Sequence, residues 1–309
     1  MPRTSSTRHN YADQIRTLLN SKEGIVDFDE VLNLFDVSPA TVRTKIKQAM
    51  AEDKSLRGRI AGVFPDTATI LDEVEDQIGP ICGANLVEAN LRSSSLVDAW
   101  SKSFAEHFCK KALGPRLNRE TNAVTATFEE LRTELLIPYE KYLTQSGNGL
   151  VSIAGTLNQS LFVRALRNSG LTDSGSNPQF KETGNKSEGD IQVYFNGSRS
   201  RKTLSVEAKS YAARERLLRG LADIQIPKVG VGFFNDAAEF GKDRVTLIAT
   251  SAHASALYMP EATLNALSVE SRKVTHPETG RICRSLENEF VEDMKAFADS
   301  GLITRRALL

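Results

Sequence analysis

Two acidic residues and one lysine, Asp190, Glu207 and Lys209, are of the types that hold a metal cation beside a phosphate. They lie in two short stretches, 188–195 and 203–209, in which apolar and polar residues alternate. Alternation of this kind predicts β-strands with one buried face. The segment between them opens with Asn-Gly and is rich in turn formers, so the two stretches are expected to pair as a hairpin.

The predicted hairpin brings the charged residues onto one polar face. Asp190 then lies roughly opposite Glu207, and Lys209 lies two residues further along. Directly opposed residues have Cβ atoms about 4.5–5.5 Å apart, so the two carboxylates repel each other unless a cation lies between them. Mg²⁺ suits such a site because it takes one or two carboxylates and keeps waters and a substrate phosphate. The alternative is a solvated hairpin face that carries a Glu–Lys ion pair.

An acidic residue followed on the next strand by Glu-x-Lys resembles the PD-(D/E)xK nuclease superfamily. The resemblance covers the hairpin closely and residues 149–250 loosely. It implies that Asp190 and Glu207 bind Mg²⁺, helped by the Ala208 carbonyl, and that Lys209 positions or deprotonates the attacking water. Gly189 stands where the name of the superfamily has a proline.

The order of predicted elements extends this resemblance. A helix at 157–169 precedes the hairpin, and a helix at 212–224 and strands at 228–234 and 244–250 follow it. The first five of these elements have the order αββαβ, which matches the common core of the superfamily. The predicted fold class is therefore α/β, with a mixed central β-sheet flanked by helices and an N-terminal helical winged-helix domain. Residues 171–186 are expected to form a long polar loop, either disordered or in contact with DNA, and 254–267 and 285–297 peripheral helices that are candidates for a dimer surface.

A third acidic ligand is not evident. In the superfamily the helix before the hairpin often presents an acidic residue to the metal, but here the polar positions are Asn158 and Gln159. We expect Gln159 to orient a metal-bound water.

Basic residues gather beside the proposed site, although the chain as a whole has 39 Lys+Arg, 39 Asp+Glu and a formal net charge of zero. The basic strip consists of Arg199, Arg201, Lys202, Lys209, Arg214, Arg216 and Arg219. Such a strip is typical of a surface that contacts a phosphate backbone, and Arg199, Arg201 and Lys202 are predicted to contact DNA. The alternative is a solvated helix face.

The N-terminal region resembles the small winged-helix modules of bacterial regulators. Helices are predicted at 11–19, 28–35 and 39–50, with Ser38 as N-cap and Pro39 in the first turn of the third. Residues 56–64 are expected to supply a short wing. The resemblance implies that the third helix enters the major groove of DNA and presents to the bases Thr41, Arg43, Thr44, Lys45 and Gln48. A winged helix that contacts protein is the alternative.

Breaker residues predict three regions. A winged-helix DNA-binding domain covers 1–66, a helical linker region 67–146 and the nuclease domain 147–309. In the middle region we expect an acidic, solvated helix at 67–77, an amphipathic helix at 95–113, and a helix at 127–143 that breaks at Pro138.

Composition and motifs restrict the class of protein. Among the 309 residues, 40% are hydrophobic and 25% charged, which is ordinary for a soluble globular protein. The apolar runs are shorter than the roughly 20 residues that span a membrane, and the first residues lack a hydrophobic signal core. The three cysteines have no Cys-x-x-Cys spacing, which favours a reducing compartment. We therefore expect a cytoplasmic protein of a bacterial or archaeal cell. A Gly-rich phosphate loop and a His-Glu-x-x-His motif are both missing, so neither a nucleotide cofactor nor zinc hydrolysis is indicated.

Together these features predict a Mg²⁺-dependent, site-specific endonuclease that resembles a type II restriction enzyme. By family resemblance, it would cut double-stranded DNA to leave 5′-phosphate and 3′-hydroxyl ends. A symmetric recognition site implies a homodimer. Two alternatives remain: a structure-specific repair or recombination nuclease, and a non-catalytic winged-helix DNA-binding regulator.

Overall fold

The computed structural model describes residues 10–118, 120–121, 123–183, 188–197, 202–209, 214–224 and 227–308, with the backbone alone for 141–152, 154–155 and 214–216. The chain forms two compact units. The first unit comprises Met1–Ile70 with Ser94–Ile153, and the second comprises Leu71–Ser93 with Ala154–Leu309. The long helices α5 (Leu86–Leu113) and α7 (Ile137–Asn168) each have residues in both units. The predicted middle region, 67–146, is therefore divided between the two units.

Three helices surround a small apolar core at the start of the first unit. They are α1 (Tyr11–Asn20), α2 (Phe28–Leu32) and α3 (Pro39–Glu52), close to their predicted positions. The side chain of Ser38 accepts the N–H of Thr41 at 3.3 Å, and Pro39 is the first helical residue, as predicted. Ile15, Val42 and Ile46 are among the residues buried between the helices.

The predicted wing has a different structure. After a short 3₁₀ turn, η1 (Lys54–Leu56), strand β2 (Ile60–Ala61) pairs in parallel with β1 (Val26–Asp27). Ile60 is completely buried in the core between the three helices. Within residues 54–64 the described structure contains no projecting hairpin, because this segment instead packs its apolar residues inward. The start of the first unit thus consists of three helices and a two-stranded parallel sheet, without the expected hairpin wing.

The rest of the first unit is helical. Between α5 and α7 lie η3 (Gly114–Arg116), β3 (Leu117–Asn118), β4 (Ala123–Val124), α6 (Phe128–Leu131) and the π-helical turn η4 (Arg132–Leu136). The predicted break at Pro138 is not observed. The chain stays helical through Pro138, and the geometry changes from π-helical in η4 to α-helical in α7 directly before this residue. Gly147 and Gly149 lie inside α7, although each costs roughly 1 kcal/mol relative to alanine.

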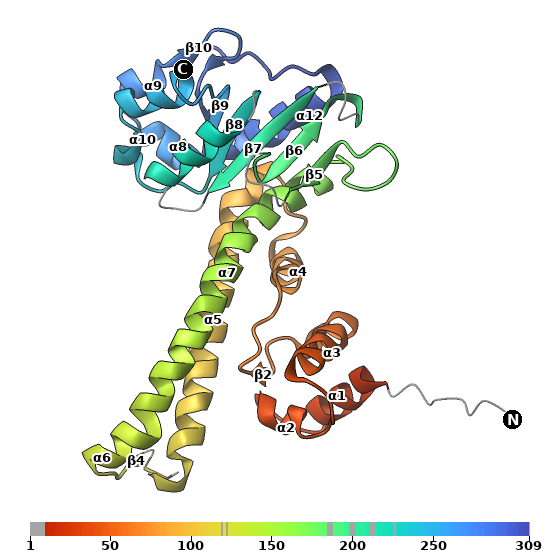
Figure 1. Ribbon diagram of the computed structural model, residues 1–309, viewed down its shortest axis with the longest axis vertical. Coiled ribbons are helices and arrows are strands. Elements are labelled where there is room, and N and C mark those ends of the chain that lie inside the picture. Colours follow the sequence, from red (N-terminus) through yellow and green to blue (C-terminus); the bar gives the residue numbers. More distant parts are fainter. Residues whose placement is uncertain are drawn as a thin grey trace, which may run out of the picture. The chain divides into compact units, whose positions relative to one another are not determined.

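The second unit is built on a six-stranded mixed sheet with the order β12-β9-β8-β7-β6-β5 (Figure 1). Its strands are β5 (Phe180–Glu182), β6 (Ile191–Tyr194), β7 (Thr203–Lys209), β8 (Lys228–Gly232), β9 (Ala256–Met259) and β12 (Cys283–Ser285). Neighbouring strands are antiparallel from β5 to β7 and parallel from β7 to β12. The chain is therefore a mixed α/β protein, which confirms the predicted fold class at this level.

Helices and short strands complete the second unit. The helical elements are α4 (Thr67–Ile78, which starts in the first unit), η2 (Gly83–Asn85), η5 (Phe195–Gly197), α8 (Arg214–Asp223), η6 (Ala237–Phe240), α9 (Lys242–Thr250), α10 (Glu261–Ala266), α11 (Val269–Arg272), the π-helical turn η7 (Leu286–Phe290) and α12 (Val291–Ser300). A small hairpin consists of β10 (Thr275–His276) and β11 (Gly280–Arg281). None of the described helices is long and apolar enough to cross a membrane.

Several predicted elements need correction. Residues 244–250 form the helix α9 instead of a strand, and Val245, Ile248 and Ala249 are buried with helical spacing. The predicted helix at 254–267 contains strand β9, and α10 begins only after Pro260. The predicted long loop contains β5, so the observed order is α7, β5, β6, β7, α8 and β8. The expected αββαβ sequence of elements is present with one strand added.

The hairpin formed by β6 and β7 lies inside the sheet, and both of its faces are covered. Ile191 and Val193 on one face are completely buried, and Gln192 and Tyr194 on the other are 8% and 1% exposed. The alternation predicted one buried face, whereas both faces are buried, and the alternative of a solvated hairpin face is also wrong. Helix α8 packs against β7 and β8, where Gly230 leaves room for leucine side chains of α8.

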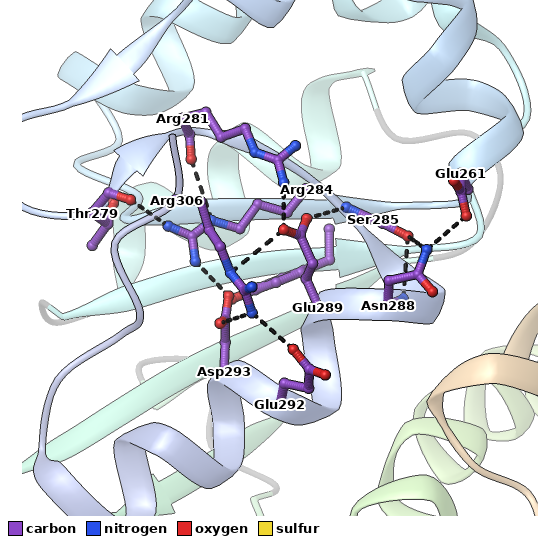
Figure 2. A network of polar contacts seen from close by, with 11 residues as sticks. Glu261, Thr279, Arg281, Arg284, Ser285, Asn288, Glu289, Glu292, Asp293 and Arg306 are labelled. Carbon is purple, nitrogen blue, oxygen red and sulfur yellow. Dashed lines mark hydrogen bonds and ion pairs between the residues drawn. The ribbon is translucent and has the colours of Figure 1, made fainter. Parts of the chain in front are cut away.

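A buried ionic network joins β12 to α12 (Figure 2). Arg284 and Asp293 have no exposed side-chain surface and form an ion pair, and the Tyr258 hydroxyl donates to the same carboxylate at 2.9 Å. Arg306 reaches the other Asp293 oxygen at 2.8 Å. Because burial and the neighbouring Asp293 both disfavour a phenolate, the pKa of Tyr258 lies well above its ordinary value.

The network fixes the segment that follows α12. The Arg281 N–H donates to the Arg306 carbonyl at 3.1 Å, and the Arg306 N–H donates to the Thr279 carbonyl at 2.9 Å. Gly280 has a φ of +76°, and a Cβ there would collide with the backbone of Arg306. These contacts hold the backbone around Arg306 against β11, so we assign them a role in stabilising the fold.

Candidate functional site

The three charged residues predicted from the sequence meet at one end of the β6–β7 pair. Asp190 directly precedes β6, and Glu207 and Lys209 lie among the last residues of β7. The Lys209 Nζ forms an ion pair with Glu207 Oε1 and lies 3.7 Å from Asp190 Oδ2. One ammonium group therefore contacts both carboxylates.

Asp190 lies where the backbone ladder between the two strands ends. The last pair is Ile191 with Val206, and the Asp190 N–H donates to the Val206 carbonyl at 2.9 Å. Beyond it, the Ala208 N–H donates to the side-chain Oδ2 of Asp190 at 2.8 Å. Among the described residues, Oδ1 of Asp190 has no hydrogen-bond partner. One carboxylate oxygen is thus fixed by the main chain, and the other is available to a cation.

Gly189 sets the direction in which Asp190 leaves the turn. Its φ is +78°, and a Cβ at this position would lie 2.8 Å from the Val206 carbonyl oxygen. A proline, whose φ is fixed near −65°, cannot adopt this conformation. The Thr183 hydroxyl donates to the Gly189 carbonyl, and the Thr183 N–H donates to the Asp190 carbonyl at 3.0 Å. The glycine at the position of the superfamily's proline is therefore required by the backbone.

Glu207 is the buried member of the site, with 6% of its surface exposed. Burial raises its pKa above the ordinary value, and the charge of Asp190 acts in the same direction, while Lys209 opposes both. An ionised Glu207 is thus stabilised by whichever cation lies beside it.

Gly220 of α8 forms the wall against which Glu207 packs. A Cβ at Gly220 would lie 2.6 Å from the Glu207 Cδ, closer than real contacts allow. Gly220 was not among the residues predicted from the sequence. The available signal was a glycine within a predicted helix, which often marks a place where another group approaches the backbone closely.

The side chain of Gln159 contacts the backbone of Asp190. Its Nε2 donates to the Asp190 carbonyl at 3.2 Å, so in the structure it supports the chain that carries Asp190. Its neighbour Asn158 is buried and accepts a hydrogen bond from Asn90 at 2.8 Å. In the part of the chain that is described, no group of three or more His, Cys, Asp or Glu residues is placed to hold a metal ion. The roles of Gln159 towards a water and of the Ala208 carbonyl as a ligand stay predictions.

The predicted DNA-contacting strip is described only in part. Arg199 and Arg201 lie outside the described residues. Lys202 is exposed, and its ammonium group lies 6.0 Å from the centre of the Phe297 ring. Lys202 is therefore the member of this predicted trio for which a position can be given.

The predicted base-reading residues lie along the polar side of α3. Arg43, Thr44 and Gln48 are exposed, and Thr41 and Lys45 are half-buried. Lys45 donates to Gln48 at 3.1 Å, and the Thr44 hydroxyl donates to a backbone carbonyl of its own helix. The guanidinium carbon of Arg43 lies 4.9 Å from the centre of the Phe28 ring. The structure thus gives α3 a polar exposed face, and its binding to DNA stays a prediction.

Comparison with protein families, curated proteins and solved structures finds no match to this chain. Its function therefore has to be inferred from the geometry of the site.

Proposed function

We propose that the chain is a Mg²⁺-dependent DNA endonuclease whose reaction centre consists of Asp190, Glu207 and Lys209. The observation that carries the proposal is the position of the Lys209 ammonium group, which contacts both carboxylates at the end of two paired strands. Two acids and an amine so arranged can hold a divalent cation and a water beside a phosphodiester.

The donor set fits magnesium. Asp190 offers its Oδ1 and Glu207 its carboxylate, and Mg²⁺ needs only one or two carboxylates because it keeps several waters. The Ala208 carbonyl would be a further oxygen ligand. When bound, the ion would stabilise charge on the phosphate and acidify a water.

Each residue of the chain then has a defined task. Asp190 and Glu207 would hold the cation, and the Ala208 N–H keeps the Asp190 carboxylate in place. Lys209 would hold the attacking water for in-line attack and screen the developing charge. The cut ends would be a 5′-phosphate and a 3′-hydroxyl.

The order of elements and the mixed sheet support the resemblance to the PD-(D/E)xK superfamily, and the exposed polar side of α3 supports contact with double-stranded DNA. We propose a type II restriction enzyme that acts as a homodimer. The Lys209–Glu207 ion pair, and the lack of a third acidic ligand among the residues that the structure describes, favour one rival, a DNA-binding regulator without catalysis.

Incubation of supercoiled plasmid with the protein and Mg²⁺ separates these proposals. Discrete fragments support a restriction enzyme, nicking that depends on DNA structure supports a repair nuclease, and intact but gel-shifted DNA supports a regulator. Lys209→Ala should abolish cleavage and preserve DNA binding. Lys273→Ala, which removes an exposed lysine after α11, is the matched control and should cleave normally. Cleavage that persists in Lys209→Ala would overturn the assignment.

A further inference from the structure

A cavity of about 890 Å³ opens in the first unit, apart from the residues assigned above to catalysis. It is lined by α5, by the start of α2, by the exposed side of α3 and by the residues that follow β2. Pockets that bind small organic molecules have volumes of about 300–1,000 Å³. The cavity is therefore large enough for such a ligand.

Its apolar lining includes Val63, Phe64, Phe104 and Phe108. Phe64 and Phe104 contact each other edge to face, with ring centres 5.2 Å apart. Aromatic rings in this arrangement present a broad apolar surface at low conformational cost. A ligand that fills the cavity should consequently have an apolar body.

Each acidic group of the lining has a basic partner, but Asp27 and Asp29 share a single lysine. Asp27 and Asp29 both form ion pairs with Lys111. Burial raises the pKa of the Asp27 carboxyl, but the hydrogen bonds that it accepts and the charge of Lys111 outweigh burial and hold this pKa below its ordinary value. Glu134 forms an ion pair with Arg116, which lies outside the cavity lining. The acids of the lining are thus held by basic side chains, and the cluster of Asp27, Asp29 and Lys111 has one negative charge left over.

Two cations of the lining are exposed and lack a carboxylate partner. Arg43 and Lys47 lie one turn apart on α3, and neither forms an ion pair with any residue that the structure describes. Arg43 lies instead over the Phe28 ring. Arg43, Lys47 and Lys111 together exceed Asp27 and Asp29 by one positive charge, so this side of the cavity attracts an anion.

We propose that this cavity binds a small organic anion, in which a carboxylate, sulfonate or phosphate group is attached to an apolar body. Arg43 and Lys47 contact the charged group, and the phenylalanine side chains contact the apolar part. This site uses none of the residues that would hold the metal, and it shares Arg43 with the side of α3 that is proposed to contact DNA.

The full-length protein can be tested with decanoate by isothermal titration calorimetry, and with 8-anilinonaphthalene-1-sulfonate by fluorescence. We expect each probe to bind saturably and to displace the other. Decylamine, which has the same chain length and the opposite charge, should bind at least about tenfold more weakly. Equal binding of decanoate and decylamine, or no binding of decanoate, would overturn the proposal, and this comparison requires no variant.

Variants then show where on the protein the ligand binds. Lys47→Glu should weaken decanoate binding at least about tenfold, while Lys45→Glu makes the same charge change on α3 outside the cavity and should have little effect. Ala112→Phe should fill part of the cavity and reduce binding without changing charge. If Lys47→Glu and Lys45→Glu bind decanoate equally, the anion binds elsewhere and the proposal is wrong. Circular dichroism and thermal melts check that each variant is folded. Plasmid cleavage by the wild-type protein with and without decanoate shows whether the two sites act separately.

Discussion

Replacing Gly220 by alanine should disturb catalysis more than stability. The new Cβ would lie 2.6 Å from Glu207 Cδ, so the Glu207 carboxylate or helix α8 must move. Overpacking of this kind costs about 1–3 kcal/mol, and the higher helix propensity of alanine returns about 1 kcal/mol. The net loss in free energy of unfolding should therefore be at most about 2 kcal/mol.

The same displacement has a larger effect on the reaction. A misplacement of about 1 Å in a catalytic group can cost about 100-fold in rate. We therefore expect Gly220→Ala to cleave plasmid DNA about 100-fold more slowly and to need more Mg²⁺ for half-maximal rate. Rates measured over a series of Mg²⁺ concentrations, together with urea denaturation, separate the two effects.

Gly241→Ala is the matched control, because a Cβ at Gly241 has no atom within 4 Å and the residue has an ordinary φ of −61°. It should cleave DNA at the wild-type rate. A Gly220→Ala protein with wild-type cleavage and wild-type dependence on Mg²⁺ would show that the position of Glu207 does not matter to the reaction. The reasoning would also be contradicted if Gly220→Ala lost activity only because a large part of the protein was unfolded under the conditions of the cleavage assay.

Three further expectations follow from buried groups. Burial raises the pKa of Glu207 above its ordinary value of 4.5, so the folded protein binds this proton more tightly than the unfolded protein does. The free energy of unfolding of the wild-type protein in EDTA should therefore fall as the pH rises from 4.5 through the pKa of the folded state. Glu207→Gln should lack this fall in thermal melts, and an equal fall in both proteins would refute the cause. Asp293→Ala should cost about 3–5 kcal/mol in urea denaturation because it leaves Arg284 as an uncompensated buried cation, whereas removing the exposed Glu292 should cost at most about 1 kcal/mol. Burial raises the pKa of Cys283 to about 12, so Ellman's reagent at pH 8 should label the exposed Cys82 and reach Cys283 only after unfolding.

Local signals in the sequence were sufficient for several features. The start of α3 follows from the cap at Ser38 and the proline after it, since both act within one helical turn. The β6–β7 pairing and the meeting of its charged residues follow from alternation and a turn-rich connection. These interactions involve residues close in sequence, so the sequence alone specifies them.

Other features depend on contacts that a local pattern does not contain. Residues 244–250 have apolar positions that fit a strand or a helix, and burial of Val245 and Ile248 against the sheet decides for the helix. The hairpin's second face is covered because further strands and helices pack around it, which alternation in two strands cannot reveal. Gly220 was missed for the same reason, since its importance depends on a carboxylate from a different element.

The main-chain contacts around the site are the strongest argument for a metal centre over an ordinary ion pair. A Glu–Lys pair on an exposed surface contributes about 0–1 kcal/mol and needs no fixed backbone. Here Gly189 adopts a conformation open to few other residues, the Ala208 N–H holds Asp190, and Gly220 leaves space for Glu207. Burying Glu207 also costs free energy that Lys209 only partly offsets, as the raised pKa of Glu207 shows. Such a cost is expected where carboxylates are fixed in advance to bind a cation of higher charge than a lysine ammonium group.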